Sequence, residues 1–248
     1  MINYFAGLSG GTEVVMVDFH SHILPGIDDG AKDVDMSVKM LETSFKQGIK
    51  TILATPHYYK AHNGIDEFIK KRNDSFNILK NKINDNMIEA PDIKCGAEVL
   101  LCHEIMKEDV EKLCIEGTNT ILVELPFTIW GDWLYEDIYL LIVKHKLNVV
   151  IAHFDRYVKN KKDFKNIEPI INLDVNIQLN ADTIITRRDR KIVDIFFNEY
   201  RVNHIGSDMH NLTTRISNMD KAVSLIEKRY GKDALDKIIS DSNKIFKG

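Results

Sequence analysis

Residues 16–30 of the chain read MVDFHSHILPGIDDG, an apolar run followed by two histidines and an acidic turn. The run Val14–Phe19 predicts a β-strand that is buried on both faces, as in a parallel sheet. His20 and His22 come directly after it, and on an extended chain their rings lie on the same side. A His-x-His pair at the end of a buried strand favours a metal site.

The same order of a β-rich run, a polar loop and a segment of helical period recurs along the chain. The other predicted strands are Thr51–Ala54, Ile93–Ala97, Thr120–Val123, Val149–Ala152, Val175–Leu179 and His204–Ser207. Helices are predicted over Asp33–Gln47, Ile65–Ile83, 133–146, 183–200 and 213–230, the first with Asp33 as N-cap and Gly48 as C-cap. This alternation predicts a parallel α/β fold. We expect a closed seven-stranded barrel, with an open doubly wound sheet as the alternative.

Six of the seven predicted strands end in residues that are able to bind a metal ion. In a parallel barrel the carboxyl ends of all strands meet at one edge, here called the rim, where active sites are assembled from the loops. The nine candidate ligands are His20, His22, Asp29, His57, Glu98, Glu124, His153, Asp208 and His210. One ion takes about four to six ligands, so this set suits two or three ions.

Taken singly, these residues have simpler interpretations. His57 or His153 alone is more typical of a buried histidine bonded to a carbonyl group, Asp28-Asp29-Gly30 of a turn, and Asp208 of a helix cap. Only the joint pattern favours a metal cluster. Imidazole and carboxylate ligands without thiolate fit Mn²⁺, Fe or Zn²⁺. Such clusters activate water near neutral pH and hold both the attacking and the leaving oxygen of an in-line displacement.

Arg156 stands three residues after His153 and brings a planar cation to the same rim. It is either a surface arginine paired with a carboxylate or an arginine that binds two oxygens of a phosphate group. The second interpretation favours hydrolysis of a phosphate ester. Aromatic residues follow rim positions at Tyr58, Tyr59, Phe127, Trp130 and Trp133, where they either wall a groove for a phenyl ring or pack the loops.

Composition excludes several classes of protein. The chain has 248 residues, 33 Lys+Arg against 37 Asp+Glu and a net charge of −4, so nucleic acid is not an expected partner. Its three cysteines, Cys95, Cys102 and Cys114, have no CxxC spacing, and none has an arginine six residues on, which excludes a cysteinyl-phosphate mechanism. The first 31 residues hold no Lys or Arg, and no apolar run approaches the ~18 residues of a membrane span. We therefore expect a cytoplasmic protein with no membrane insertion and reduced thiols.

The chain resembles the PHP (polymerase and histidinol phosphatase) superfamily, and within it the bacterial manganese-dependent protein tyrosine phosphatases of capsule and exopolysaccharide loci. The matching stretches are MVDFHSHILPGIDDG (16–30), GIKTILATPH (48–57), CGAE (95–98), ILVELP (121–126), VIAHFDRY (150–157) and SDMHN (207–211). The resemblance implies a distorted seven-stranded TIM-like barrel, the PHP fold, as a single domain over 16–248. Residues 1–15 are then an extension outside the core.

The resemblance also implies three metal ions, most simply Mn²⁺. His20, His22, Glu98 and Asp208 would hold the first, Glu98, Glu124 and His153 the second, and Asp29, His57 and His210 the third. Arg156, Asp208 and His210 are the expected catalytic residues, and Arg156, Tyr58 and Trp130 the expected substrate-binding ones. Asp155 stands where the family has glutamate.

The substrate that the resemblance implies is the phosphotyrosine cluster of an autophosphorylating tyrosine kinase that controls polysaccharide export. The alternatives are a histidinol-phosphate or other small-molecule phosphatase, a metal-dependent nuclease and a binding module without catalysis. The sequence makes no prediction about the oligomeric state.

Overall fold

The structure is a computed structural model that describes residues 15–247. Its strands are β1 (Val17–Ser21), β2 (Thr51–Ala54), β3 (His57–Tyr58), β4 (Asp92–Cys95), β5 (Glu98–Leu100), β6 (Thr120–Glu124), β7 (Asn148–Ile151), β8 (Asn176–Asn180) and β9 (His204–Gly206). Its α-helices are α1 (Val34–Lys46), α2 (Ile65–Asp85), α3 (Asp132–Val143), α4 (Phe164–Ile171), α5 (Ala181–Ile185), α6 (Arg190–Glu199), α7 (Met219–Tyr230) and α8 (Lys232–Lys244). A short 3-10 helix, η3, spans Phe154–Tyr157.

All strand pairs in the described residues are parallel. They form one sheet in the order β1-β2-β4 and a second in the order β3-β5-β6-β7-β8-β9. The predicted strand Ile93–Ala97 is divided at Gly96 into β4 and β5, and β2 gives way to β3 across Pro56, which has no backbone N–H to donate. The chain thus passes from the first sheet to the second twice, each time just before a candidate ligand, and returns to the first sheet through α2 in between.

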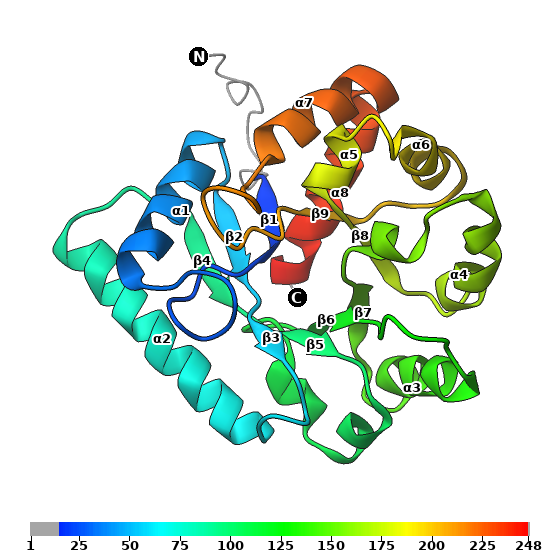
Figure 1. Cartoon of the computed structure of the whole chain (residues 1–248), viewed down its shortest axis with the longest axis horizontal. Coiled ribbons are helices and arrows are strands. Elements are labelled where there is room, and N and C mark those ends of the chain that lie inside the picture. The colour runs from blue at the N-terminus through cyan, green and yellow to red at the C-terminus, as the bar shows by residue number, and fades with distance from the viewer. Residues whose placement is uncertain (1–14, 248) are drawn as a thin grey trace.

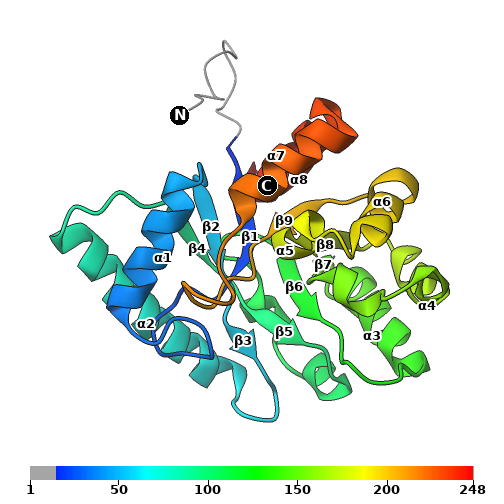
Figure 2. The same ribbon diagram turned by 45° about the horizontal axis from the view of Figure 1, so that its top comes forward.

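The first and last strands also meet. Ser21 and Met209 form an isolated parallel bridge, the N–H of His22 donates to the carbonyl of Met209 at 3.0 Å, and the N–H of Asp208 donates to the carbonyl of His20 at 2.8 Å. In Figures 1 and 2 the strands occupy the middle of the molecule, with α1 and α2 on one side and α3 to α6 on the other. The parallel α/β prediction is confirmed, whereas full closure into a seven-stranded barrel stays a prediction.

Two apolar clusters lie on opposite faces of the strands. Ile121, Val123, Val149 and Ile151 belong to the larger cluster, which includes the inner faces of the helices. Their neighbours Leu122, Val150 and Ala152 point the other way and form the smaller cluster with Val17, Phe19, Leu53 and Ile115. Ile245 and Phe246 pack against the smaller cluster. Glu98 and Glu124 alternate with members of the larger cluster, so they share the face of the smaller one.

Helix boundaries follow the expected chemistry in some places and depart from it in others. The carboxylate of Asp33 accepts the N–H of Met36 at 2.8 Å at the start of α1, and Gly48, with φ 85°, follows its end. The single helix predicted over 183–200 is wrong, because a turn at Thr186–Asp189 separates α5 from α6. The helix predicted over 213–230 begins only at Met219, and α4 and α8 were not predicted.

The predicted strand over Val14–Phe19 starts at Val17, and Val14 lies outside the described residues, as does the predicted extension apart from Val15. Backbone groups of Val15 are held by the amide of Asn243 in α8. Within residues 15–247, none of the helices combines the length and the apolar character needed to cross a membrane.

Candidate metal centre

The structure brings all nine candidate ligands together at the carboxyl ends of the strands. Four groups each place their ligand atoms within 4.8 Å of one another: His22, Asp29, His57 and His210; His20, His22 and Asp208; His20, Glu98 and His153; and His57, Glu98 and Glu124. Shared members connect the four groups into one cluster. Side chains that are up to 190 residues apart in the sequence therefore meet because parallel strands deliver their ends to one edge.

Four lone-pair atoms converge in the deepest part of this cluster. Nε2 of His20 lies 3.1 Å from Nε2 of His22. Oε2 of Glu98 lies 3.2 Å and 3.3 Å from these two nitrogens, and Oδ1 of Asp208 lies 3.8 Å and 3.5 Å from them. All four side chains are almost completely buried. Two imidazoles and two carboxylates that face one another in a buried space form a set that a divalent cation satisfies.

Asp28 decides which nitrogen of His22 is available. Its Oδ2 lies 2.7 Å from Nδ1 of His22, so Nδ1 carries a hydrogen and donates it. Burial alone would lower the pKa of His22, but the contacts with Asp28 and Glu98 outweigh it and raise that pKa to about 10. The negative charges of Asp28 and Glu98 that favour a proton on this ring also attract a metal cation. A metal ion and a proton therefore compete for Nε2 of His22. The sequence indicated only a turn at Asp28, and its contact with His22 was missed.

Glu98 lies at the centre of the cluster. Its Oε1 is 2.6 Å from Nε2 of His153, and its Oε2 is 2.9 Å from Nδ1 of His57. Burial favours the neutral acid, yet the coulombic attraction of His20 and hydrogen bonds from the surrounding imidazoles hold the pKa of Glu98 well below its usual value. Glu98 is therefore an ionised carboxylate with both oxygens directed at histidines. The two oxygens face different histidines, the geometry expected of a bridging ligand.

The outer part of the cluster is more accessible. Asp29 is 65% exposed, and its Oδ1 lies 3.4 Å from Nε2 of His57 and 3.3 Å from Nε2 of His210. Burial lowers the pKa of His210 to about 4, so this ring is neutral and can coordinate a cation. Nδ1 of His57, Oε2 of Glu98 and Nε2 of His210 are buried, and none of them makes a well-aligned hydrogen bond in spite of the short contacts around them. Buried polar atoms without such a bond are costly, and cations bound within the cluster would satisfy them.

Two of the ligand positions have an uncommon backbone conformation. His153 has φ 33° and Asp208 has φ 51°, both in the left-handed region that non-glycine residues rarely adopt. Each residue lies two positions beyond the end of β7 or β9, where this turn directs its side chain into the cluster. Backbone strain of this kind concentrates at functional sites.

Two arginines bind Asp208 from the solvent side. Arg156, at 35% exposure, contacts its Oδ2, and Arg215, at 37% exposure, donates to its Oδ1 at 2.8 Å. The sequence identified Arg156 through its place after His153. It did not identify Arg215, which lies seven residues beyond Asp208 in a loop that the side chain of Asn211 orders through three backbone N–H groups. Both guanidinium groups therefore reach the ligand cluster while remaining accessible to solvent.

The aromatic side chains divide into two kinds. Tyr58 is buried, packs edge-on against Phe68 and donates its hydroxyl to a carbonyl, so its expected place in a substrate groove does not fit the structure. Adjacent strand residues point to opposite faces, and it is Tyr59 that stacks on His57, with ring centroids 5.2 Å apart. Trp130 is half-buried and packs against Tyr157, its indole N–H bonded to the carbonyl of Pro126.

Phe127 is 60% exposed and lies beside a different candidate ligand from Tyr59. Its ring is stacked at 6.1 Å from the ring of His153 and at 5.2 Å from that of Tyr157. The loop that carries it also exposes Ile129 almost completely. Phe127 and Tyr59 are thus the aromatic rings that stack directly on the candidate ligands.

Asp155 has a structural place beside the site. Its carboxylate accepts the backbone N–H of Asn180 at 2.9 Å and the hydroxyl of Thr183 at 2.6 Å, which ties η3 to the start of α5. Burial raises the pKa of this carboxyl. Asp155 faces away from the cluster while its neighbour Arg156 faces Asp208.

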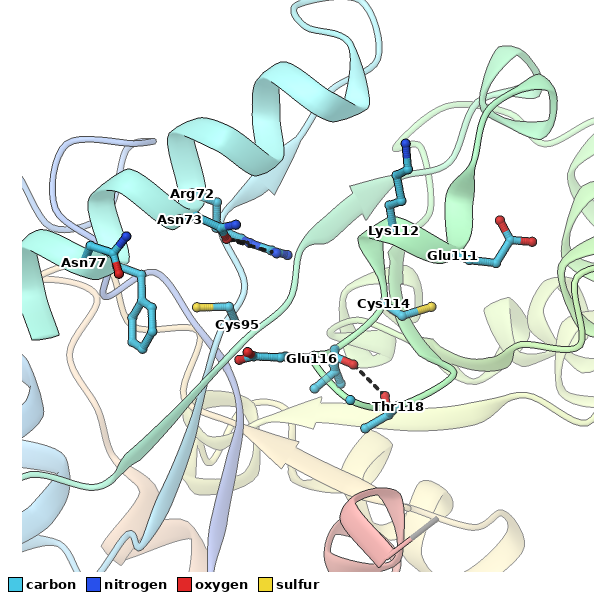
Figure 3. A pocket seen from close by; sticks show the side chains of 12 residues that line it. Arg72, Asn73, Asn77, Cys95, Glu111, Lys112, Cys114, Glu116 and Thr118 are labelled. Atoms are coloured by element: carbon cyan, nitrogen blue, oxygen red, sulfur yellow. Dashed lines mark hydrogen bonds between the residues drawn. The ribbon is translucent and has the colours of Figure 1, made fainter.

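A separate cleft of about 430 Å³ lies between α2 and the loop before β6 and contains none of the nine candidate ligands (Figure 3). Arg72 lines it and donates to the carbonyl of Gly96, the residue that divides β4 from β5. Cys95 and Cys114 also line it, and burial raises their pKa to about 11 and about 12, so both stay protonated thiols. We attach the chemistry to the ligand cluster, because the cleft holds neither a thiolate nor convergent ligand atoms.

Comparison with known proteins agrees with this geometry. Residues 16–247 match the family described as "Capsular polysaccharide synthesis, CpsB/CapC". The tyrosine-protein phosphatase CpsB of Streptococcus agalactiae serotype III is 27% identical over 94% of this chain and 98% of its own length. The tyrosine-protein phosphatase YwqE of Bacillus subtilis is 28% identical over 88% of this chain and 86% of its own.

A solved structure shows the same fold. Its description reads "Crystal structures of YwqE from Bacillus subtilis and CpsB from Streptococcus pneumoniae, unique metal-dependent tyrosine phosphatases". The two structures superimpose over 94% of each chain with a TM-score of 0.80 at 23% sequence identity. A phosphotriesterase homology protein from Escherichia coli, with phosphate in its active site, matches more distantly, with a TM-score of 0.55 at 11% identity.

Proposed function

Because the chain belongs to the capsular polysaccharide synthesis CpsB/CapC family, we propose that it is a metal-dependent protein tyrosine phosphatase. The observation that carries the proposal is the cluster of nine imidazoles and carboxylates with Arg156 and Arg215 at its edge. Relatives that align over almost their whole length are named tyrosine-protein phosphatases. The proposal includes a seven-stranded barrel of the PHP kind, with residues 16–248 as one domain.

The ligand set is compatible with two or three divalent ions, and Mn²⁺ is our first choice, before Fe or Zn²⁺. His20, His22, Glu98 and Asp208 would hold the innermost ion, and Glu98 would share a second with Glu124 and His153. Asp29, His57 and His210 would hold an outer one. When bound, such ions supply Lewis acidity to the phosphoryl group and lower the pKa of coordinated water. The convergence of all nine side chains supports this assignment.

Arg156 and Arg215 are the residues that would bind the phosphate group of the substrate. A guanidinium group is a planar fork that binds two oxygens of a phosphoryl group at once, and it carries its charge at every physiological pH. Arg156 and Arg215 bring two such forks to Asp208, next to where the phosphorus must lie. Their charges would stabilise the negative charge that grows on the equatorial oxygens during displacement.

The aromatic rings favour an aryl ester as substrate. Phe127 and Tyr59 stack on His153 and His57, and their rings are exposed and half-buried, respectively. A phenyl ring packed against either of them would place its ester oxygen near the ligands. The phenolate of tyrosine, with a conjugate acid of pKa ~10, is a better leaving group than an alkoxide, so the site needs no strong general acid.

A phosphotyrosine-bearing bacterial tyrosine kinase is the substrate that we propose, with control of capsular or extracellular polysaccharide synthesis as the outcome. Cytoplasmic residence stays part of this proposal. The family to which the chain belongs supports the link to capsule synthesis.

The test is a competition between substrates with the Mn²⁺-loaded protein. We expect hydrolysis of a phosphotyrosine peptide to exceed that of histidinol phosphate, and no cleavage of labelled single-stranded DNA. His20→Ala and Asp208→Ala should each lower turnover by orders of magnitude while the circular dichroism spectrum is retained. Preference for histidinol phosphate would replace the proposal with a small-molecule phosphatase, and full activity in either variant would remove it.

A further inference from the structure

Strand β8 is the strand that the sequence leaves without a candidate ligand, yet it directs two amide side chains at the cluster. Gln178 is fully buried and Asn180 is 5% exposed. Their neighbours Ile177 and Leu179 belong to the larger apolar cluster, so both amides point to the opposite face, where the ligands lie. A buried amide must have its hydrogen bonds satisfied, and the partners of these two are informative.

A backbone group fixes the orientation of Gln178. The N–H of His153 can only donate, and it lies 2.7 Å from Oε1 of Gln178, so the oxygen must be at this end of the amide. The nitrogen is then at the other end, where it donates to Oδ1 of Asn180 at 2.9 Å. This orients the second amide in turn, and Nδ2 of Asn180 donates to Oδ2 of Asp208 at 3.0 Å.

The same oxygen of Gln178 also faces His20. It lies 3.2 Å from Nδ1 of His20 and has a second lone pair to offer. A carbonyl oxygen only accepts, so in the neutral ring the hydrogen is on Nδ1 and Nε2 is free. The free nitrogen is the one directed toward His22 and Glu98.

We propose that Gln178 and Asn180 are positioning residues, which set the tautomer of His20 and the orientation of Asp208 for cation binding without touching the cation. The series of hydrogen bonds begins at the backbone N–H of His153 and ends at the carboxylate of Asp208. Because the first group can only donate and the last can only accept, the direction of every hydrogen bond between them is fixed. The inference rests on the metal-binding part of the proposed function and not on the identity of the substrate.

The backbone of β9 packs closely against Gln178 and His20. Gly206 of β9 pairs with Asn180 and lies against both Gln178 and His20. A Cβ at Gly206 would be 2.5 Å from Cβ of His20 and 2.9 Å from Nε2 of Gln178, distances that real side chains do not reach. Glycine at this position therefore lets β8 and β1 approach closely enough for the amide to reach the imidazole.

The test combines two measurements on three variants. Two-bond ¹H–¹⁵N correlation spectra of the metal-free protein report the tautomer of His20, and calorimetric titration with Mn²⁺ alone reports affinity. Gln178→Leu removes the acceptor, so we expect His20 to lose its Nδ1–H form and Mn²⁺ affinity to fall about 10- to 100-fold, the usual effect of losing such a partner.

Gln178→Glu separates positioning from packing. A carboxylate still accepts from His153 and His20, so the tautomer should be kept, but it cannot donate to Asn180, so Mn²⁺ affinity should still fall. Asn176→Ala is the matched control, because Asn176 lies in the same strand as Gln178 and the substitution breaks an amide contact of 2.6 Å with Asn148 in β7. It should change neither the tautomer nor the affinity.

An Nε2–H tautomer in the wild-type protein, or wild-type Mn²⁺ affinity in Gln178→Glu, would overturn the inference. Should Gln178→Leu fail to fold, Gln178→Glu alone decides. If the predicted tautomer and affinities are found but phosphotyrosine is not hydrolysed, the proposed function fails and the positioning role stands.

Discussion

The Nε2 atoms of His20 and His22 face each other at 3.1 Å, and the Nδ1 atom of each ring is bonded on its far side. Gln178 accepts from the first ring and Asp28 from the second. Two nitrogens that both present lone pairs repel each other unless a proton or a metal ion lies between them. Oε2 of Glu98, within 3.3 Å of both nitrogens, strengthens the same requirement. The fold therefore holds an arrangement that binding of a cation stabilises.

Replacing Asp28 with asparagine should weaken the control of the His22 tautomer. Oδ2 of Asp28 accepts from Nδ1 of His22 and from the N–H of His57, and Oδ1 accepts from the N–H of Gly30. An uncharged amide has only one oxygen for these three donors, so the hydrogen on Nδ1 is held less firmly and can move to Nε2, the atom that must coordinate. We expect Mn²⁺ affinity to fall about 10- to 100-fold in calorimetric titration. Asp33→Asn is the control in the same loop, since asparagine caps α1 as well as aspartate does. Equal affinities in the two variants would contradict the assigned role of Asp28.

Loss of either arginine should lower catalysis without loss of metal. Arg156→Ala and Arg215→Ala each remove one charged fork, and kcat/KM for p-nitrophenyl phosphate should fall about 10²- to 10³-fold. Metal content, measured by inductively coupled plasma mass spectrometry, should stay at the wild-type value. Arg188, 87% exposed, provides the control. If Arg188→Ala lowered kcat/KM as much, the effect would be one of general surface charge.

Phe127→Ala should weaken the binding of aryl phosphates selectively. Its exposed ring, stacked on His153, is worth about 0.5–1.5 kcal/mol to an aromatic partner beyond area burial, so KM for phosphotyrosine should rise about 3- to 10-fold. KM for glycerol phosphate should be unchanged. Ile129→Ala in the same loop, at a side chain that is 99% exposed, should leave both values as they are. An equal rise for both substrates would exclude a stacking role.

His204 should make the folded state sensitive to acid. Its ring stacks on Phe19 at 3.9 Å, and burial lowers the pKa of His204 to about 3. The unfolded chain takes up a proton below the ordinary pKa near 6.5, and the folded chain does not. Stability is therefore lost as pH falls from about 6.5 toward 3, at up to about 1.4 kcal/mol per pH unit, and is unaffected above this range.

Urea denaturation in the presence of a chelator measures this effect. His204→Gln removes the titration, so the free energy of unfolding of the variant should depend less steeply on pH than that of the wild type below pH ~6. Parallel curves for the two proteins would show that His204 is not the group responsible.

The ligand cluster was predictable because it depends on a topological rule. Parallel strands deliver their carboxyl ends to one edge, so His57, Glu98 and Asp208 could be placed together from the sequence with no knowledge of their distances. Gln178 and Asn180 were missed for the opposite reason, since an uncharged amide in a strand looks the same whether it orients a ligand or fills a core.

Local geometry accounts for the other differences. The strand over 93–97 looked continuous, but the chain changes sheet at Gly96, a tertiary effect that propensity does not register. Tyr58 was placed in the groove because it follows His57, whereas strand alternation turns it into the core and leaves Tyr59 at the rim. Arg215 reaches Asp208 through a loop whose shape depends on Asn211, and no spacing rule encodes that contact.

The central claim is that the nine convergent side chains hold divalent cations. A crystal structure of the Mn²⁺-loaded protein, with anomalous difference maps at the manganese edge, tests it most directly. The account predicts two or three anomalous peaks among these side chains, each about 2.0–2.3 Å from imidazole nitrogens and carboxylate oxygens. Maps without such peaks at saturating Mn²⁺, or with manganese bound only elsewhere on the chain, would contradict it.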